Sequence, residues 1–355
     1  MGRDKAEING IQQVGIGVEN AKEAWAWYRK AFKMDVPIFE DRAEAKLMTR
    51  YTAGKVEKRH AILALNMQGG GGFEIWQYTS RTPQASKQKP SWKDLGILAV
   101  KIRCRDIAAT YKHLGEVGAE LLQKPVKNPI GVMHFYVNDP FGNLFEIEEN
   151  SSWFQKSKDL TGGVSGVVIG VSSIDEALPI YQNHLQHSDK AFDDSKNWED
   201  FSCFEYGDKP YRRVILNGNS TPCGAFGKLF CQTSLELIET DQPERKKVFE
   251  GRNWGDLGFI HVCFDVINMS SLKEDLASSG VPLTVDSESK FDMGSAAGRF
   301  AYLEDPDGTL VEMVETYKIP IMEKLGWFLD LTKRDVRKSL PKYMIKMLAL
   351  NRVKS

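Results

Sequence analysis

Two glutamates stand among apolar side chains, where a charge needs a partner. Successive side chains of a β-strand point to opposite faces, so Glu74 shares a face with Trp76 and Tyr78. By the same alternation, Glu312 lies between two apolar neighbours on its own face. A buried carboxylate is costly unless it is ion-paired, metal-bound or protonated. These residues therefore indicate a metal site, a proton-transfer site or a structural ion pair. His261 lies in another apolar run, where a histidine is either hydrogen bonded in the core or bound to a metal.

An internal repeat organises the chain that carries these residues. Residues 74–106 align with residues 236–268 at an offset of 162, and both copies contain Trp-x-Asp-Leu-Gly. The stretch Asp139-Pro-Phe-Gly-Asn-Leu-Phe-Glu pairs with Asp305-Pro-Asp-Gly-Thr-Leu-Val-Glu. Near the two starts, Gln13-Val-Gly-Ile-Gly-Val pairs with Gly166-Val-Val-Ile-Gly-Val. The chain is therefore a duplication.

Each half divides again into two units with the order β-α-β-β-β. Opening strands are predicted at 14–18, 98–102, 167–171 and 260–264, and closing strands at 73–78, 144–148, 235–239 and 310–314. Amphipathic helices are expected between them, the first capped by Asn20 and the others at 107–114, 174–185 and 270–276. The two Asp-Pro-x-Gly stretches predict tight turns that lead into the last strand. The pattern is that of an α+β fold.

This pattern gives the chain three predicted parts. Residues 1–150 form a first half with units at about 8–80 and 95–150, and residues 151–316 form a second half with units at about 162–240 and 256–316. Residues 317–355 form a basic helical extension, in which Met322, Leu325 and Leu329 have helical spacing and a second helix starts near Ser339 and Pro341.

The four units, with their Val-x-Ile-x-Val openings and Asp-Pro-x-Gly-x-Leu-x-Glu endings, resemble the vicinal oxygen chelate superfamily. Its members include glyoxalase I, extradiol and 4-hydroxyphenylpyruvate-type dioxygenases, methylmalonyl-CoA epimerase and bleomycin-resistance proteins. The resemblance covers roughly residues 8–316 and implies that the units pair into two half-open barrels. Each half-barrel of this superfamily can hold one divalent metal ion.

The resemblance also implies where ligands stand, just before each opening strand and inside each closing strand. The first position is occupied by Gln13, Ala99, Gly166 and His261, and the second by Glu74, Glu146, Glu236 and Glu312. Gln12 is the inward residue instead of Gln13 if the register slips by one.

Which units pair decides the ligand set. Pairing of the first unit with the fourth gives Gln13, Glu74, His261 and Glu312, the ligand types of zinc-type glyoxalase I, and leaves the second and third units metal-free. Pairing of neighbours gives the sets Gln13, Glu74 and Glu146, and Glu236, His261 and Glu312. Neither of these sets has the two histidines and one carboxylate of a non-haem iron oxygenase. We favour the pairing of the first unit with the fourth.

The favoured set implies one divalent ion, Zn²⁺, Mn²⁺, Ni²⁺ or Fe²⁺, and a lyase or isomerase that abstracts a proton next to a carbonyl. Glu312 is then the main base, Glu74 acts on the opposite side, and His261 and Gln13 are plain ligands. Two alternatives stay open: a dioxygenase-like enzyme with its metal in the second half, and a metal-free small-molecule binding or resistance protein.

Other residues carry weaker signals. Trp76 and Tyr78 could shape an apolar substrate pocket, although aromatic core packing is the commoner role. The glycines at 69–72 lack the Lys-Ser/Thr of a phosphate loop and predict a flexible hairpin.

Composition limits the partners. The net charge of −1 argues against a general nucleic-acid binder, and five scattered cysteines fit reduced thiols in a cytoplasmic protein. No apolar run is long enough to span a membrane, and the start is charged rather than signal-like. Residues 317–355 hold ten basic and three acidic side chains, a net of +7, which leaves −8 for the rest. This tail is expected to pack on the protein's own barrel. The two alternatives are a contact between the subunits of a homodimer and a contact with an anionic membrane surface. The protein is expected to be a monomer or a homodimer.

Overall fold

The computed structural model describes residues 5–288, 291–292, 297–322 and 326–353. The first residues of the chain and Leu325, on which two of the expectations rest, lie outside these ranges. Within the described ranges, no helix is both long enough and apolar enough to cross a membrane.

Four units of the expected order follow one another along the chain. The first contains β1 (Glu7–Gly17), α1 (Ala21–Phe32), β2 (Val36–Glu44), η1 (Lys46–Tyr51), β3 (Lys58–Leu65) and β4 (Gly72–Tyr78). The second contains β5 (Gly96–Cys104), α2 (Ile107–Glu116), β6 (Glu120–Leu121), β7 (Val126–Lys127), β8 (Met133–Asn138) and β9 (Leu144–Glu149).

The second half repeats this arrangement. The third unit contains β10 (Thr161–Gly170), α3 (Ile174–Leu178), η2 (Pro179–His184), β11 (Asp189–Asn197), η3 (Glu199–Phe201), β12 (Pro210–Asn217), α4 (Gly227–Phe230) and β13 (Ser234–Glu239). The fourth contains β14 (Gly258–Ile267), α5 (Met269–Ser278), β15 (Val285–Asp286), β16 (Phe291–Asp292), β17 (Ala297–Glu304) and β18 (Leu310–Met322). The α+β prediction and the four units are therefore confirmed.

Local signals explain these elements. The Asn20 side chain accepts hydrogen bonds from the backbone N–H groups of Lys22 and Glu23, which fixes the start of α1. The two predicted Asp-Pro turns connect antiparallel strands, β8 to β9 and β17 to β18. Asp139 in the first turn accepts a hydrogen bond of 2.6 Å from the Tyr28 hydroxyl, and Asp305 in the second accepts one of 2.8 Å from Tyr181. Each turn is thus held by a helical residue of the unit on which it packs.

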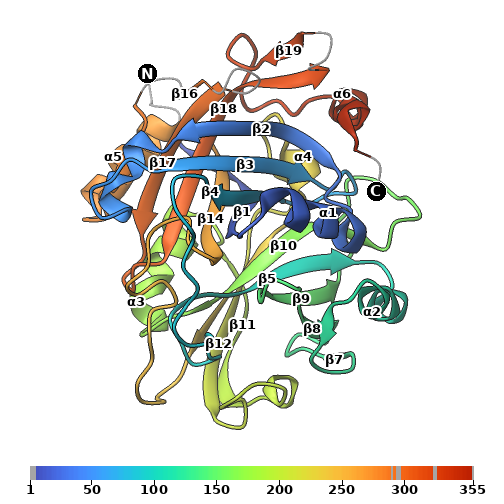
Figure 1. The fold of residues 1–355 in the computed structure, drawn as a ribbon, viewed down its shortest axis with the longest axis vertical. Coiled ribbons are helices and arrows are strands. Elements are labelled where there is room, and N and C mark those ends of the chain that lie inside the picture. Colours follow the sequence, from blue (N-terminus) through green and yellow to red (C-terminus); the bar gives the residue numbers. More distant parts are fainter. Residues whose placement is uncertain (1–4, 289–290, 293–296, 323–325, 354–355) are drawn as a thin grey trace.

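The first unit pairs with the fourth, and the second with the third. Over the described residues, one sheet has the strand order β15-β17-β18-β14-β1-β4-β3-β2, and the other has the order β11-β12-β13-β10-β5-β9-β8-β6. Each sheet curls into a half-barrel, and Figure 1 shows the blue and orange strands above the green and yellow ones. We call these the 1/4 half-barrel and the 2/3 half-barrel. The favoured pairing is confirmed, and the proposed halves 1–150 and 151–316 each contribute one unit to both sheets.

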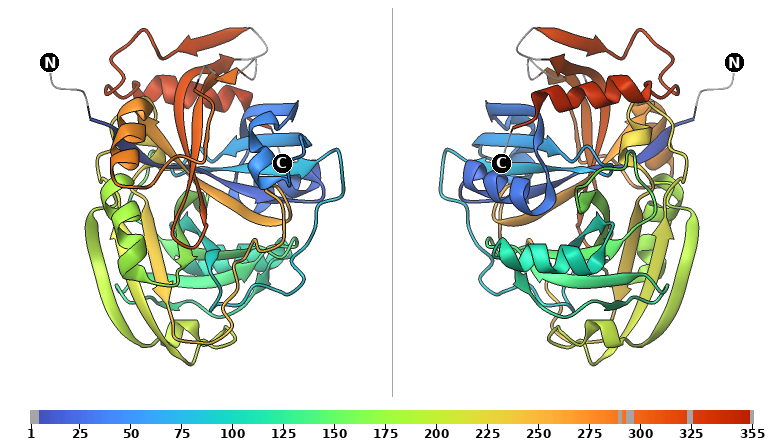
Figure 2. Two further views of the ribbon diagram at one scale, coloured as in Figure 1. Left: turned by 90° about the vertical axis from the view of Figure 1, so that its left-hand side faces the viewer. Right: turned by 90° about the vertical axis from the view of Figure 1, so that its right-hand side faces the viewer.

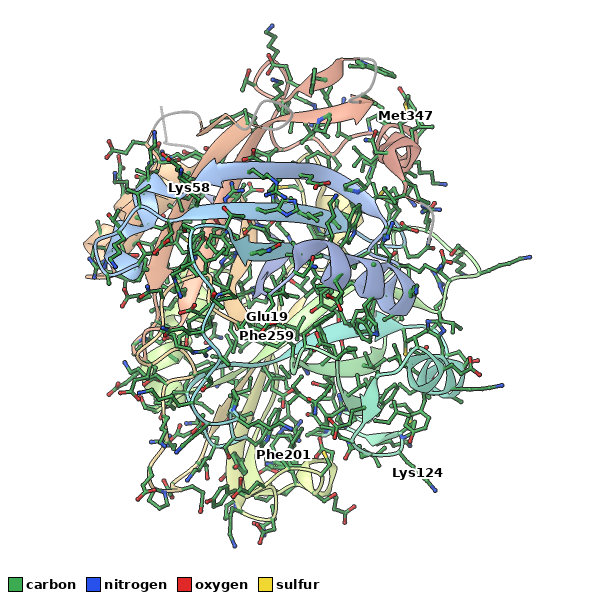
Figure 3. The ribbon with its side chains drawn as sticks, in the orientation of Figure 1. Glu19, Lys58, Lys124, Phe201, Phe259 and Met347 are labelled. Carbon is green, nitrogen blue, oxygen red and sulfur yellow. The ribbon has the colours of Figure 1, made fainter. Side chains whose placement is uncertain are left out.

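The glycine run at 69–72 joins the two half-barrels and does not form an exposed hairpin. The backbones of Gly71 and Val164 exchange hydrogen bonds of 3.0 and 2.8 Å, and Gly163 N–H donates to the Gly69 carbonyl. Cβ atoms added at Gly69 and Gly70 would lie 2.7 Å from atoms across the junction. Phe259 lies at the same junction, with its ring 5.5 Å from that of Phe145 (Figure 3). Glycine is used here because two backbones approach closely.

The tail is helical only in its second part. The prediction of a helix through Met322 and Leu329 is wrong, because β18 continues to Met322 and pairs with β19 (Trp327–Asp330). Ile319 and Ile321 are both buried, so the period-2 pattern of β18 prevails over the helical spacing. The predicted second helix is confirmed as α6 (Lys342–Met347), which continues into η5 (Leu348–Asn351).

The tail packs on the protein's own barrel, as expected. Its side chains Leu340, Ile345 and Leu348 are buried in one cluster with residues of the 1/4 half-barrel. Arg352 lies 3.2 Å from Asp35, whose carbonyl also accepts the Val353 N–H. Figure 2 shows the C-terminal helix, in dark red, lying crosswise to the blue strands of the first unit, and η5 contacts β2.

Candidate metal centre

Four neighbouring strands of the 1/4 half-barrel bring the predicted ligands together. Glu74 stands on β4, Gln13 on β1, His261 on β14 and Glu312 on β18, and these strands are consecutive in the sheet. The registers are symmetric. Gly15 lies beside both His261 and Glu74, while Cys263 occupies the equivalent place beside Gln13 and Glu312. The four predicted ligands therefore lie at nearly the same level of the sheet, one on each of four neighbouring strands.

The ligand atoms meet at one point. His261 Nε2 lies 3.0 Å from Glu312 Oε2 and 3.5 Å from Glu74 Oε2. The Gln13 amide nitrogen donates a hydrogen bond of 3.3 Å to Glu312 Oε2. One donor atom from each of Glu74, His261 and Glu312 falls within 4.8 Å of the others, which is compact enough for a single ion. All four side chains are buried.

Burial and mutual contact shift the pKa values of the cluster. Burial and the neighbouring Glu312 carboxylate raise the pKa of Glu74. Burial also opposes ionisation of Glu312, but His261, Tyr302 and Cys263 outweigh it and lower the pKa of that carboxyl. Burial lowers the pKa of His261, and the two carboxylates overcome this effect and raise it. The two glutamates thus differ in their readiness to hold a proton.

The residues fit a divalent cation. Among the described residues, the Gln13 Oε1 atom has no hydrogen-bond partner, and His261 Nε2 meets no group in hydrogen-bond geometry although both atoms are buried. A buried polar atom without a hydrogen-bond partner, such as Gln13 Oε1, is rare, and the ion-pair partners of His261 Nε2 are the carboxylates of Glu312 and Glu74. One amide oxygen, one imidazole and two carboxylates are a donor set suited to Zn²⁺, Mn²⁺, Fe²⁺ or Ni²⁺. Glu74, His261 and Glu312 thus form a triad that could hold a metal ion, with Gln13 beside it.

Two residues that support His261 were missed from the sequence. The Tyr302 hydroxyl lies 3.3 Å from His261 Nδ1 and shares a hydrogen bond with it, which fixes the orientation of the ring. A Cβ atom at Gly15 would lie 2.4 Å from the imidazole, so only glycine leaves room for it. The glycine was visible in Val-Gly-Ile-Gly-Val, but Tyr302 gave no signal because its register against Glu312 depends on β17 pairing with β18.

A bulge explains why both candidate glutamines face inward. The register of β1 against β14 shifts between Ile11 and Gln13, so Gln12 and Gln13 both line the same cavity. Gln12 lies 3.4 Å from Asp265 and 3.3 Å from Thr316, whereas Gln13 contacts Glu312. Gln13 is therefore the residue at the cluster.

The comparisons with known proteins agree with this architecture. Residues 10–147 match the sequence model of the Glyoxalase/Bleomycin resistance protein/Dioxygenase superfamily. Residues 10–147 belong to this superfamily. The rest of the four-unit region repeats the same fold, so the whole region has the superfamily's architecture. No curated protein matches the sequence.

Two solved structures have the same fold at low sequence identity. Glyoxalase I from Zea mays is 12% identical, with a TM-score of 0.55, and the alignment covers 87% of this chain and 93% of that one. A putative dioxygenase from Bacillus subtilis is 14% identical, with a TM-score of 0.54, and the alignment covers 88% of this chain and 86% of that one. At such identities the likeness is one of fold.

The 2/3 half-barrel holds a different cluster at the equivalent point of the superfamily fold. Lys101 Nζ lies 3.0 Å from Glu146 and 2.6 Å from Glu236, and Arg213 lies 2.7 Å from Glu236. His134 adds a contact of 2.7 Å to Glu146. Both carboxylates thus have internal cationic partners. The alternative ligand sets that combine Glu146 with Gln13, or Glu236 with His261, are wrong because their members lie in different sheets.

A cavity of about 410 Å³ opens from the cluster of the 1/4 half-barrel. Gln13, Glu74 and Glu312 line it, and Trp254 contributes an aromatic wall. The expected pocket residues Trp76 and Tyr78 are buried behind Trp254: the indole rings of Trp76 and Trp254 lie 4.7 Å apart, and the Tyr78 hydroxyl donates to the Trp254 carbonyl. Trp76 lies on the inward face of β4, but Trp254, from the loop before β14, lines the cavity in its place.

Proposed function

We propose that this protein is a metal-dependent lyase or isomerase that moves a proton next to a carbonyl group of a small molecule. The observation that carries the proposal is the convergence of Gln13, Glu74, His261 and Glu312 on one buried point that opens into a cavity. Glyoxalase I from Zea mays, which has the same fold, supports this reaction class by analogy.

The four residues would hold one divalent ion, which supplies a Lewis acid that stabilises negative charge on a carbonyl oxygen. His261 presents Nε2 while Tyr302 holds Nδ1, and Gln13 presents its amide oxygen. These two side chains hold the ion in position, and they do not exchange protons with the substrate.

The two carboxylates perform the proton transfer. Glu312 takes the proton from the carbon next to the carbonyl, and the electron pair of the broken C–H bond moves toward the carbonyl oxygen. The same proton then returns to the neighbouring carbon, so no oxidant or reductant is needed. Glu74 on β4, across from Glu312 on β18, moves the proton of the substrate hydroxyl to the former carbonyl oxygen, so that both protons end on the product. Burial of both groups keeps water from competing for these protons.

Metal content per chain is the deciding measurement. Wild-type protein freed of its purification tag should hold about one equivalent of a transition metal after exposure to Zn²⁺, Mn²⁺, Fe²⁺ or Ni²⁺, and His261→Ala should hold none. Glu312→Gln should lose metal, while its counterpart in the other half-barrel, Glu146→Gln, should keep it. Absence of metal from the wild type would overturn the proposal and favour a metal-free binding protein. Oxygen consumption by the Fe²⁺-loaded protein would favour a dioxygenase instead.

A further inference from the structure

The cavity beside the cluster is lined mainly by apolar side chains, and its cover comes from outside the two units that form the 1/4 half-barrel. Phe226 and Phe230 reach it from the α4 segment of the third unit, and Leu348 reaches it from the tail. All three side chains are buried. The wall that these three side chains form is therefore apolar, with two aromatic rings.

The two covering segments are connected to each other. The Leu340 N–H donates a hydrogen bond of 3.0 Å to the Ala225 carbonyl, and the Gly224 N–H donates to the Arg337 carbonyl. The Gly70 N–H donates to the Leu229 carbonyl and ties α4 to the junction of the half-barrels. These backbone groups thus bond to protein, and the residues that the two segments contribute to the cavity, Phe226, Phe230 and Leu348, have apolar side chains.

The exposed part of the lining lies at the opposite side. Glu44 ends β2, Lys46 and Leu47 follow in η1, and Leu47 is 46% exposed. Gly298 and Phe300 on β17 are partly exposed across from them. A substrate in this cavity is thus in reach of the polar cluster and of the phenylalanine and leucine cover.

The buried charges of the lining are already engaged. Arg299 forms hydrogen bonds of 2.8 and 3.0 Å to Asp286 and one of 2.9 Å to Ser270. Arg59 lies 3.5 Å from the Asp41 carboxylate and acts electrostatically on Glu74. A second carboxylate or phosphate on a substrate would be desolvated against phenylalanine and leucine side chains, which is costly.

We propose that the substrate is a compact carbonyl compound with two vicinal oxygens and an apolar alkyl or aryl body, not one conjugated to a charged peptide or nucleotide. Its oxygens lie at Gln13, Glu74, His261 and Glu312, and its body lies against Phe226, Phe230 and Leu348. This inference rests on the proposed function for the position of the oxygens, and on the cover for the body.

Hydroxamates test it without turnover, because they present two vicinal oxygens and vary only in their body. Calorimetry would compare acetohydroxamate, octanohydroxamate and the monohydroxamate of suberic acid, which carries a carboxylate at the far end of a chain of equal length. Each methylene is expected to raise affinity up to about fourfold, so octanohydroxamate should bind metal-loaded protein at least about 100-fold more tightly than acetohydroxamate. The terminal carboxylate should remove most of that gain. Phe230→Ser should weaken octanohydroxamate about tenfold and leave acetohydroxamate unchanged, and Leu348→Ser is the second variant if Phe230→Ser fails to fold.

The outcomes separate this inference from the proposed function. Equal affinities for the three hydroxamates on protein that contains metal would overturn the inference and leave the metal centre intact. A gain with chain length on protein that takes up no metal would uphold the apolar cavity and overturn the proposed function. Tighter binding of the suberic compound than of octanohydroxamate would also overturn the inference, because it would require a cationic partner at the covered end.

Discussion

The two half-barrels place a pair of glutamates at equivalent points but compensate their charge by different means. In the 2/3 half-barrel, Lys101 stands between Glu146 and Glu236. In the 1/4 half-barrel, the place equivalent to Lys101 in the register is occupied by Cys263, which brings no charge to Glu74 and Glu312. One scaffold thus carries either its own cation or a set of side chains that could hold an external cation.

Glycines in the neighbouring strands leave room for the His261 ring in one half-barrel and for the Lys101 side chain in the other. Gly15 leaves space for the His261 ring, and a Cβ atom at Gly166 would lie 3.1 Å from the Lys101 side chain. At the positions equivalent to His261 and Gln13, the 2/3 half-barrel has Ala99 and Gly166, which offer no ligand atoms. The difference between a candidate metal centre and a salt-bridge network therefore depends on a few strand positions. Figure 3 shows Phe201, in the core of the 2/3 half-barrel, far from the cover that includes the helix of Met347.

The largest effect is expected from removing the internal cation. Lys101→Met leaves Glu146 and Glu236 with less compensation in a fully buried place, and breaking a buried ion pair costs about 3–5 kcal/mol. Urea denaturation should show a loss of this size in the free energy of unfolding. Lys333→Met, at a lysine that is 83% exposed, should change it by less than about 0.5 kcal/mol. If both variants were equally stable, the 2/3 half-barrel would not depend on Lys101 for its charge balance.

A pH dependence follows from the same network. Glu146 and Asp200 outweigh the burial of His134 and raise its pKa to about 9, whereas an unfolded histidine titrates near 6.5. Because the folded pKa is the higher one, the stabilisation is fully present below about pH 6.5 and is lost as the pH rises through about 9. The free energy of unfolding should fall by about 3 kcal/mol over this window. Denaturation at pH 6.5 and 9.5 measures the fall, and His134→Gln should abolish most of it; an unchanged slope in that variant would assign the effect to another group.

Metal should stabilise the 1/4 half-barrel and leave the 2/3 half-barrel unaffected. Binding to the native state alone adds about 2.7 kcal/mol when the free ion is at 100 times its Kd. Thermal unfolding with Zn²⁺ or Mn²⁺, and again after treatment with EDTA, should show this difference in the wild type. His261→Ala should lose the difference and Glu146→Gln should keep it. A metal effect that survives in His261→Ala would place the ion elsewhere.

Most of the fold could be predicted because its signals are local and occur four times. The cap at Asn20, the two Asp-Pro turns and the alternating closing strands each follow from neighbouring residues. The end of β18 could not be predicted, because Met322 has both helical and strand patterns around it and pairing with β19 decides between them.

The candidate site was predictable only in part. Glu74 and Glu312 were marked by their apolar neighbours, and His261 by its strand. The role of Lys101 was not visible, because a lysine in an alternating strand normally faces solvent and its partner Glu236 is 135 residues away in sequence. The difference between the two half-barrels therefore emerges only when the sheets are assembled.

The smallest predicted effect concerns Tyr302 and its counterpart Tyr136. Tyr302 pairs with Glu312 in one sheet, and Tyr136 pairs with Glu146 at the equivalent place in the other. Tyr302→Phe removes the hydroxyl that shares a hydrogen bond with His261 Nδ1, and loss of such a support typically lowers metal affinity about 10–100-fold. Tyr136→Phe is the matched control, since the Tyr136 hydroxyl is buried and has no hydrogen-bond partner among the described residues. Metal titration of the two variants should show weaker binding only for Tyr302→Phe, with the maximal stoichiometry unchanged. Equal affinities in both would mean that packing against β17, not the hydroxyl, holds the imidazole in place, because the two substitutions delete the same atom from equivalent positions of one fold.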